Sequence, residues 1–223
     1  MSEECVQEVD AEKVKEAARS AVERGESIRE DVRNLTLKAL SEGRLDVKKM
    51  NQVIRAVTEG ASLGAEAKGA HVKDALLDTL SGIDDALAKS AEASKLAIEE
   101  TAGHVKDFSR QDLKRALDDL LTLEDLFLDT AHDVAKGADD LVKGTLSDLI
   151  QHAKHSGTSV GKTASDAVTT LNQKLSNTLK DTASASAHVT MEVGAHIANA
   201  AAGMLQGFAE TLQPGQKSKS DKE

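Results

Sequence analysis

The sequence is poor in the residues that build compact enzyme cores and in those that break helices. Its 223 residues include no Trp, no Tyr, three Phe and one Pro. An enzyme of this length usually places more aromatic side chains in its core, and before Pro214 no proline interrupts a helix. The remaining composition is rich in Ala, Leu, Lys, Asp and Glu, which favour helices. The sequence therefore predicts an all-α protein, an elongated bundle of long amphipathic helices with coiled-coil-like packing.

Basic residues are too few for a nucleic-acid binder. The chain has 28 Lys and Arg against 38 Asp and Glu, a net charge of −10. Binding to phosphates requires a basic face, so we expect no nucleic-acid partner. The single cysteine, Cys5, excludes a disulfide within one chain. Residues 1–20 contain no apolar run of the secretory kind, and we expect a bacterial-type cytoplasmic protein.

Capping residues and glycines divide the chain into regions. Asp10 and Asp46 are predicted helix N-caps, and Gly25, Gly43 and Gly60 are predicted helix ends. These signals predict short helices in the first part of the chain and longer ones after it. The four predicted regions are a flexible leader (1–10), a short-helix region (11–60), long amphipathic helices (61–212) and a disordered polar tail (213–223).

The long region is predicted to hold three helices. The first covers residues 61–107. Ser109 and Asp112 have the spacing of a capping box and begin the second, which runs to about residue 155. A Gly/Ser-rich break at 155–161 precedes the last helix, 162–212.

Residues 193–212, VGAHIANAAAGMLQGFAETL, are long enough to cross a bilayer but have the wrong pattern. On a helical wheel His196, Asn199, Gln206 and Glu210 lie opposite the apolar side chains, so the segment is amphipathic and we expect no membrane span. The stripe either packs on other helices or lies on a surface. No Lys or Arg occurs between Asp181 and Gln216, which favours a neutral surface. The candidate binding stripe is Val193, Ile197, Met204, Leu205, Phe208 and Leu212.

A second apolar concentration, LLTLEDLFLD at 120–129, predicts burial on several sides. A heptad-like seam passes through it and is interrupted by one acid, Glu124. The seam is predicted to be either the centre of a bundle or the interface of a homo-oligomer, in which Glu124 would specify register. Its candidate residues are Leu113, Leu117, Leu120, Glu124, Phe127, Val134 and Leu141.

No residue pattern predicts catalysis, a cofactor or a metal. His152 and His155 share a helix face, but no cysteine and no Glu-x-x-His accompanies them. The stretch GTSVGKTAS at 157–165 is similar to a phosphate-binding loop with one residue too few between its glycines, and no strand precedes it. We expect a non-enzymatic protein with no catalytic, cofactor or metal residues.

The stretch AEASKLAIEETAGHVKDFSRQDLKRALDDLLTLEDLFLDTAHDVA, residues 91–135, resembles the phasins, amphipathic helical proteins that coat polyhydroxyalkanoate granules. The stretches RGESIREDVRNLTLKAL and AVTEGASLGAEAK resemble an uncharacterised proteobacterial all-helical family. The phasin resemblance implies association with a granule through amphipathic helices. Residues 24–60 do not share it.

Two functions follow as hypotheses. In the first, the protein coats a neutral hydrophobic surface, a lipid or a polyester granule, as phasins do. In the second, it is a self-associating scaffold, a protein–protein interaction bundle joined through residues 113–141. A surface-binding protein should co-sediment with particles through the 193–212 stripe, whereas a scaffold should form an oligomer of fixed size.

Overall fold

The computed structural model describes residues 10–104, 108–175 and 187–211, and within them the chain is all-α. These residues form nine α-helices and one short 3-10 helix, with no strand, which confirms the predicted fold class. The predicted leader and tail lie almost wholly outside the described residues. The elements are α1 (Ala11–Arg24), α2 (Ile28–Ser41), α3 (Val47–Glu66), η1 (Gly69–His71), α4 (Val72–His104), α5 (Arg110–Leu121), α6 (Leu123–Gly137), α7 (Asp140–Ser156), α8 (Ser159–Leu175) and α9 (Ala187–Thr211).

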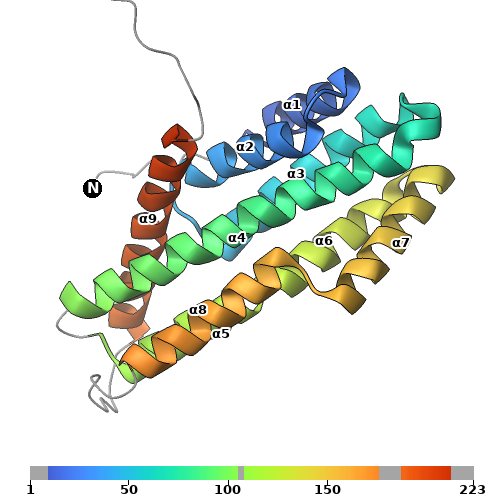
Figure 1. The fold of residues 1–223 in the computed structure, drawn as a ribbon. Helices are drawn as coiled ribbons and strands as arrows, with labels where there is room; N and C mark the ends of the chain where they lie inside the picture. Colours follow the sequence, from blue (N-terminus) through green and yellow to red (C-terminus); the bar gives the residue numbers. More distant parts are fainter. Residues whose placement is uncertain (1–9, 105–107, 176–186, 212–223) are drawn as a thin grey trace, which may run out of the picture.

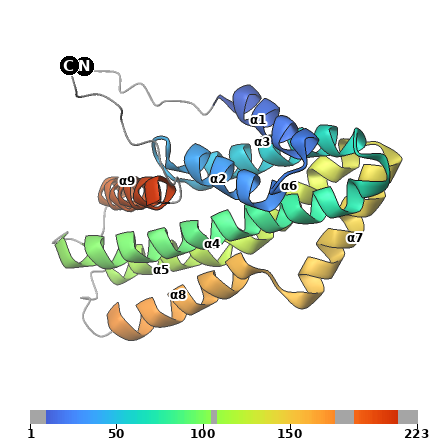
Figure 2. The ribbon, with the colours of Figure 1, turned by 45° about the horizontal axis from the view of Figure 1, so that its top comes forward.

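The helices form three layers, with one helix laid across an end (Figures 1 and 2). Helices α3 and α4 make the middle layer. Helices α1 and α2 cover one of its faces, and α5–α8 cover the other. Helix α9 packs on α4 and α2, and Figure 2 shows it end-on where α4 lies lengthwise, so the two cross steeply. One continuous hydrophobic core joins all three layers and α9.

The helix ends follow the capping signals. The Asp10 carboxylate accepts from the Lys13 N–H at 3.2 Å, and Asp46 accepts from the Lys49 N–H at 2.9 Å. Ser109 and Asp112 form the predicted capping box. Gly25 closes α1 with φ +76°, a left-handed conformation that favours glycine.

Helix α3 does not end at Gly60 as predicted but continues to Glu66. Gly60 and Gly64 let α1 approach closely. A Cβ on Gly60 would overlap the Lys15 carbonyl, and a Cβ on Gly64 would lie 2.7 Å from the Arg19 carbonyl oxygen. These glycines therefore serve helix–helix packing rather than termination.

The single helix predicted from 109 to about 155 is three helices, α5, α6 and α7. The Thr122 hydroxyl donates to the Asp119 carbonyl at 2.8 Å where α5 ends. Asp139 accepts from the Val142 N–H at 2.8 Å and begins α7. These local side-chain bonds compete with a continuous helix. The last predicted helix is likewise two, because α8 starts at Ser159 and α9 at Ala187.

Helix α8 runs parallel to α4, and polar contacts fix the alignment. Asp84 of α4 accepts from the backbone N–H groups of Ser159 and Val160, both at 2.8 Å. Fifteen residues further along both helices, Lys174 donates to Glu99 at 3.0 Å, with the same sequence offset of 75 residues as the Asp84–Ser159 pair. The constant offset shows that the two helices keep one register along α8.

Candidate functional site: helix α9 and the cavity beneath it

Helix α9 has one apolar and one polar face, as the sequence predicts. Val193 and Leu205 are buried at 2% and 0% exposure. Ile197, Met204 and Phe208 are half-buried and pack against the core. Leu212 lies outside the described residues. The exposed side chains include those of His196, Asn199, Gln206 and Glu210.

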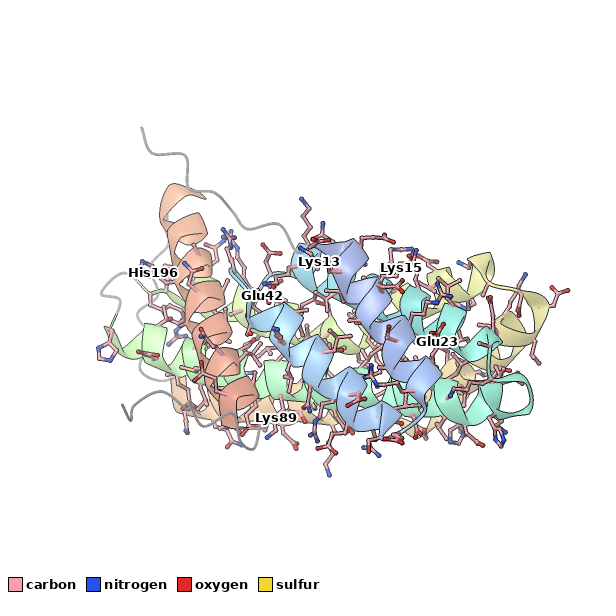
Figure 3. The ribbon with its side chains drawn as sticks, turned by 90° about the horizontal axis from the view of Figure 1, so that it is seen from above. Lys13, Lys15, Glu23, Glu42, Lys89 and His196 are labelled. Atoms are coloured by element: carbon pink, nitrogen blue, oxygen red, sulfur yellow. The ribbon has the colours of Figure 1, made fainter. Side chains whose placement is uncertain are left out.

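The apolar face of α9 lies on the chain's own α4 and α2 (Figure 3). The Leu45 N–H donates to the Ala198 carbonyl of α9 at 3.2 Å. The Lys89 ammonium of α4 lies 5.6 Å from the centre of the Phe208 ring, within cation–π range. Helix α9 itself contains no Lys or Arg. Packing on neighbouring helices, one of the two alternatives predicted for the stripe, is thus what the structure shows.

The stripe is not covered along its whole length. Beside the last turns of α9, a shallow open depression is lined by Leu96, Met204, Gly207 and Phe208, with Glu99 and Glu100 at its border. Leu96 is 39% exposed. The half-buried end of the stripe therefore adjoins an apolar side chain of α4 that faces solvent.

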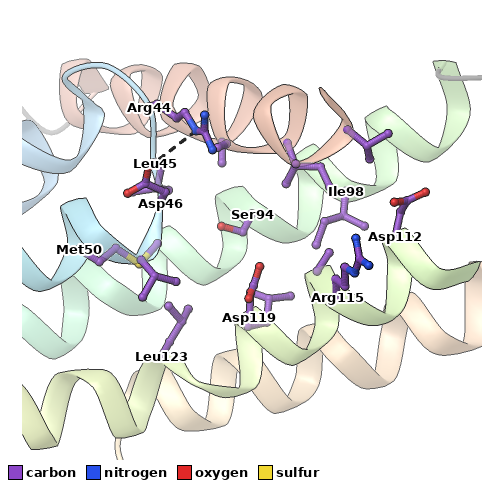
Figure 4. A pocket seen from close by; sticks show the side chains of 18 of the residues that line it. Arg44, Leu45, Asp46, Met50, Ser94, Ile98, Asp112, Arg115, Asp119 and Leu123 are labelled. Atoms are coloured by element: carbon purple, nitrogen blue, oxygen red, sulfur yellow. Dashed lines mark ion pairs between the residues drawn. The ribbon is translucent and has the colours of Figure 1, made fainter. Parts of the chain in front are cut away.

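A cavity of about 590 Å³ lies under the other half of α9 (Figure 4). Its walls come from α9, α4, α5 and the start of α3 with the loop before it. Most of the side chains around it are apolar, among them Leu45, Met50, Ile98, Leu123, Val193 and Ile197. Four segments far apart in the sequence thus border one largely apolar space that is open to solvent on one side.

A few polar side chains also reach this cavity. Ser94 of α4 and Asp119 of α5 project into the space below α9, with Arg115 beside them (Figure 4). Partial burial, with the neighbouring Asp118 carboxylate, raises the pKa of Asp119 above its ordinary value. Arg44 pairs with Asp46 at 3.7 Å on the rim.

Two charged groups are buried without full pairing near this region. The Asp112 Oδ2 atom accepts from Ser109, but its Oδ1 atom has no hydrogen-bond partner. The Lys49 ammonium is also unpartnered, and burial lowers its pKa below the ordinary value against the opposing attraction of Glu42 and Asp46. The sequence predicts Asp112 in the capping box but does not predict that it or Lys49 is buried, because only the fold shows burial.

The predicted seam is largely inside the chain's own core. Leu113, Leu117, Leu120, Phe127 and Val134 are all buried, each under 8% exposed. Leu141 is 59% exposed and does not belong with them. The heptad count assumed one continuous helix, whereas the breaks at Thr122 and at 138–139 reset the direction of the side chains.

Glu124 has partners within its own chain. Its Oε1 atom accepts from the Thr158 N–H at 3.1 Å and from the Thr158 hydroxyl at 2.6 Å. Together with Asp84 it therefore places a second carboxylate on the N-terminus of α8, where unpaired N–H groups favour negative charge. The stretch similar to a phosphate loop is thus a helix start held by two of the chain's own carboxylates.

Other candidate chemistry is dispersed. His152 and His155 are exposed on α7. Over residues 10–104, 108–175 and 187–211, no three His, Cys, Asp or Glu residues are placed so that they could hold a metal ion. In the same residues no helix has both the length and the apolar character needed to cross a bilayer.

Comparison with known proteins assigns a family without a known activity. No curated protein and no solved structure matches the chain. A family model, described as a family of unknown function (DUF6781), matches residues 4–214, nearly the whole sequence. The chain therefore belongs to the DUF6781 family.

Proposed function

We propose that this protein is a non-enzymatic helical protein that associates with a neutral hydrophobic surface through the apolar face of α9, in the manner of a phasin on a granule. One observation carries the proposal. The large apolar side chains at the end of α9, Met204 and Phe208, are only half-buried and adjoin the solvent-facing Leu96. These side chains form an apolar edge that a surface can contact first, before the rest of the stripe leaves α4 and α2.

The charge of α9 favours a neutral surface over an anionic one. Helices that bind anionic lipid carry Lys and Arg on the polar face. Helix α9 has none, and it carries Glu192 and Glu210. The whole chain is also acidic, with a net charge of −10. An uncharged polyester or neutral lipid therefore fits better than an anionic bilayer.

Full engagement requires α9 to exchange its contacts with α4 and α2 for the surface, because Val193 and Leu205 face the core. The exchange also uncovers the apolar side chains of α4 and α2 on which α9 packs, so the surface has to offset that exposure as well. A surface gains where the stripe is half-buried now, since full burial of a large apolar side chain is worth about 1.5–3 kcal/mol relative to exposure. Ile197, Met204 and Phe208 are the three that stand to gain.

Co-sedimentation with polyhydroxybutyrate particles tests the proposal. We expect wild type to bind the particles but not vesicles of anionic phosphatidylglycerol. Phe208→Glu should bind the particles several-fold less, because it places a charge on the apolar edge. Leu141→Glu is the matched control, since Leu141 is an exposed apolar residue on α7. Equal binding by wild type and Phe208→Glu, or binding by neither, would refute the proposal.

A reversible crosslink tests the exchange step. The Leu45 N–H donates to the Ala198 carbonyl at 3.2 Å, so the two backbones are adjacent and these positions are chosen for a cysteine pair. In a Cys5→Ser background, Leu45→Cys with Ala198→Cys should hold α9 on the body when oxidised and lower particle binding, and reduction should restore it. Particle binding that is unchanged by oxidation would show that α9 does not need to leave.

The alternative function is a self-associating scaffold, but most residues of its predicted interface are buried within the single chain. Five of the seven seam residues are buried within the chain, and Glu124 is hydrogen-bonded to Thr158. A scaffold would need another face. Light scattering on the protein without particles measures the oligomer size directly.

A further inference from the structure

We propose that the cavity beneath α9 binds a small uncharged aliphatic molecule with a hydroxyl head. Its volume of about 590 Å³ is in the usual range of small-molecule sites, about 300–1,000 Å³. Side chains from α3, α4, α5 and α9 border it, so a bound molecule would touch the middle layer, the α5 side of the bundle and the crossing helix. Val193 and Ile197 of the surface stripe also line the cavity, so the site exists only while α9 is docked, and its test uses the chain without particles.

The walls select an aliphatic body. Met50, Ile98, Leu123, Val193 and Ile197 all line the cavity. An apolar chain that enters it loses contact with water on most of its surface, which favours binding in proportion to the area buried. Hydrophobic walls with a small number of polar groups are typical of ligand sites.

Two polar side chains define the place of the head. The buried hydroxyls of Thr58, Thr79 and Ser90 each donate to a carbonyl one helix turn earlier. The Ser94 hydroxyl, on α4 and directed at the cavity, makes no such bond within the described residues. Asp119 faces the same space from α5. A ligand hydroxyl can donate to the Asp119 carboxylate and accept from Ser94.

The charges around the cavity favour a neutral head. Three cationic side chains line it, those of Arg44, Lys48 and Arg115. Three acidic ones line it as well, those of Asp46, Asp112 and Asp119. A carboxylate or an ammonium would be attracted by one set of charges and repelled by the other, in addition to losing its hydration. A hydroxyl avoids that loss.

Titration calorimetry on the full chain, without particles, tests the proposal with three probes of equal length. We expect 1-octanol to bind one molecule per chain, and octanoate and octylammonium to bind about tenfold more weakly, a difference of about 1.4 kcal/mol. Ser94→Ala should weaken octanol by about fivefold through loss of one hydrogen bond. If octanol shows no saturable binding, or if the charged probes bind equally well, the proposal is wrong.

Filling the cavity separates this site from nonspecific apolar binding. Ala116→Phe and Gly194→Leu each add a side chain at the wall, and a Cβ on Gly194 meets no atom within 4 Å. Gly203→Leu is the matched control, because Gly203 is also an open position on α9 but does not line the cavity. Loss of octanol binding in Gly194→Leu with retention in Gly203→Leu supports the site. Undiminished binding in both cavity variants, with helicity unchanged, overturns it.

Discussion

Gly161→Ala should lower the free energy of unfolding of wild type but raise it in a chain that lacks Glu124. Gly161 lies in the first turn of α8, directly against the Glu124 carboxylate. A Cβ at this position would overlap that carboxylate and displace it. The displaced group would lose its hydrogen bonds to the Thr158 N–H and hydroxyl. The substitution therefore acts on the hydrogen bonds at the start of α8 as well as on the helix backbone.

Two opposing contributions set the magnitude. Ala is favoured over Gly inside a helix by about 1 kcal/mol. Loss of a carboxylate cap with its charge-assisted hydrogen bonds costs about 2 kcal/mol. Gly161→Ala should therefore lower the free energy of unfolding of wild type by about 1 kcal/mol. In a Glu124→Ala background the hydrogen bonds to Thr158 are already gone, while Asp84 caps α8 in both backgrounds. The same substitution should there raise the free energy of unfolding by about 1 kcal/mol.

Urea unfolding followed by far-ultraviolet circular dichroism measures both values, and the double-mutant cycle should give a coupling of about 2 kcal/mol. Gly144→Ala is the control, because Gly144 is exposed in α7 with no atom near its missing Cβ. It should stabilise both backgrounds equally. If Gly161→Ala shifts the two backgrounds by the same amount, Glu124 is not the group that it displaces.

Two further predictions concern buried positions. Gly60→Ala should destabilise the protein by about 3 kcal/mol or more, because the new methyl group would overlap the Lys15 backbone. Gly103→Ala, at a position with no atom within 4 Å, should not destabilise it. Urea unfolding compares the two variants, and equal effects would mean that α1 and α3 are not in close contact. Lys49→Met should raise the free energy of unfolding at pH 7 by about 1 kcal/mol, because it removes a buried ammonium without a partner. Burial lowers the pKa of Lys49 in the folded state, so between that pKa and the ordinary value near 10.4 the unfolded chain binds more protons than the folded one. The free energy of unfolding of wild type should therefore rise with pH through this window. Unfolding curves from pH 7 to 10 should show this contribution in wild type and not in Lys49→Met; equal slopes would place the ammonium in water.

The helix starts could be predicted because their causes are local. Asp10, Asp46 and Ser109 each accept from a backbone N–H three residues later, so neighbouring residues alone determine the cap. The polar face of α9 was predictable for the same reason, since a period of 3.6 residues is set within the segment. Both kinds of signal need no knowledge of the rest of the chain.

Glycine shows where local reasoning fails. Gly25 and Gly60 look alike in the sequence, yet the first ends α1 with a positive φ and the second lies in the middle of α3. The two glycines differ in what packs against them, because of the two only Gly60 faces the backbone of another helix, at Lys15 of α1. The sequence does not show which helix will approach a glycine.

The cavity and the role of Glu124 were beyond prediction for a related reason. Ser94 and Asp119 are 25 positions apart and Glu124 is 34 positions from Thr158, with helix ends between them. An uninterrupted heptad count predicts Glu124 either at the centre of a bundle or in an oligomer interface. Once Thr122 ends α5, the next helix turns the same side chain toward α8. Small capping bonds therefore decide which long-range contacts a side chain can make.

The apolar stripe of α9 fits both of its predicted uses because they demand the same pattern. Packing on α4 and covering a surface both bury Val193 and Leu205 while leaving Gln206 and Glu210 in water. The two uses compete, so apparent surface affinity is reduced by the fraction of chains in which α9 is docked. The oxidised crosslink between positions 45 and 198 would make that fraction one. Particle binding that persists after oxidation would then need no undocked α9, and the part that reduction restores would be the part that depends on undocking.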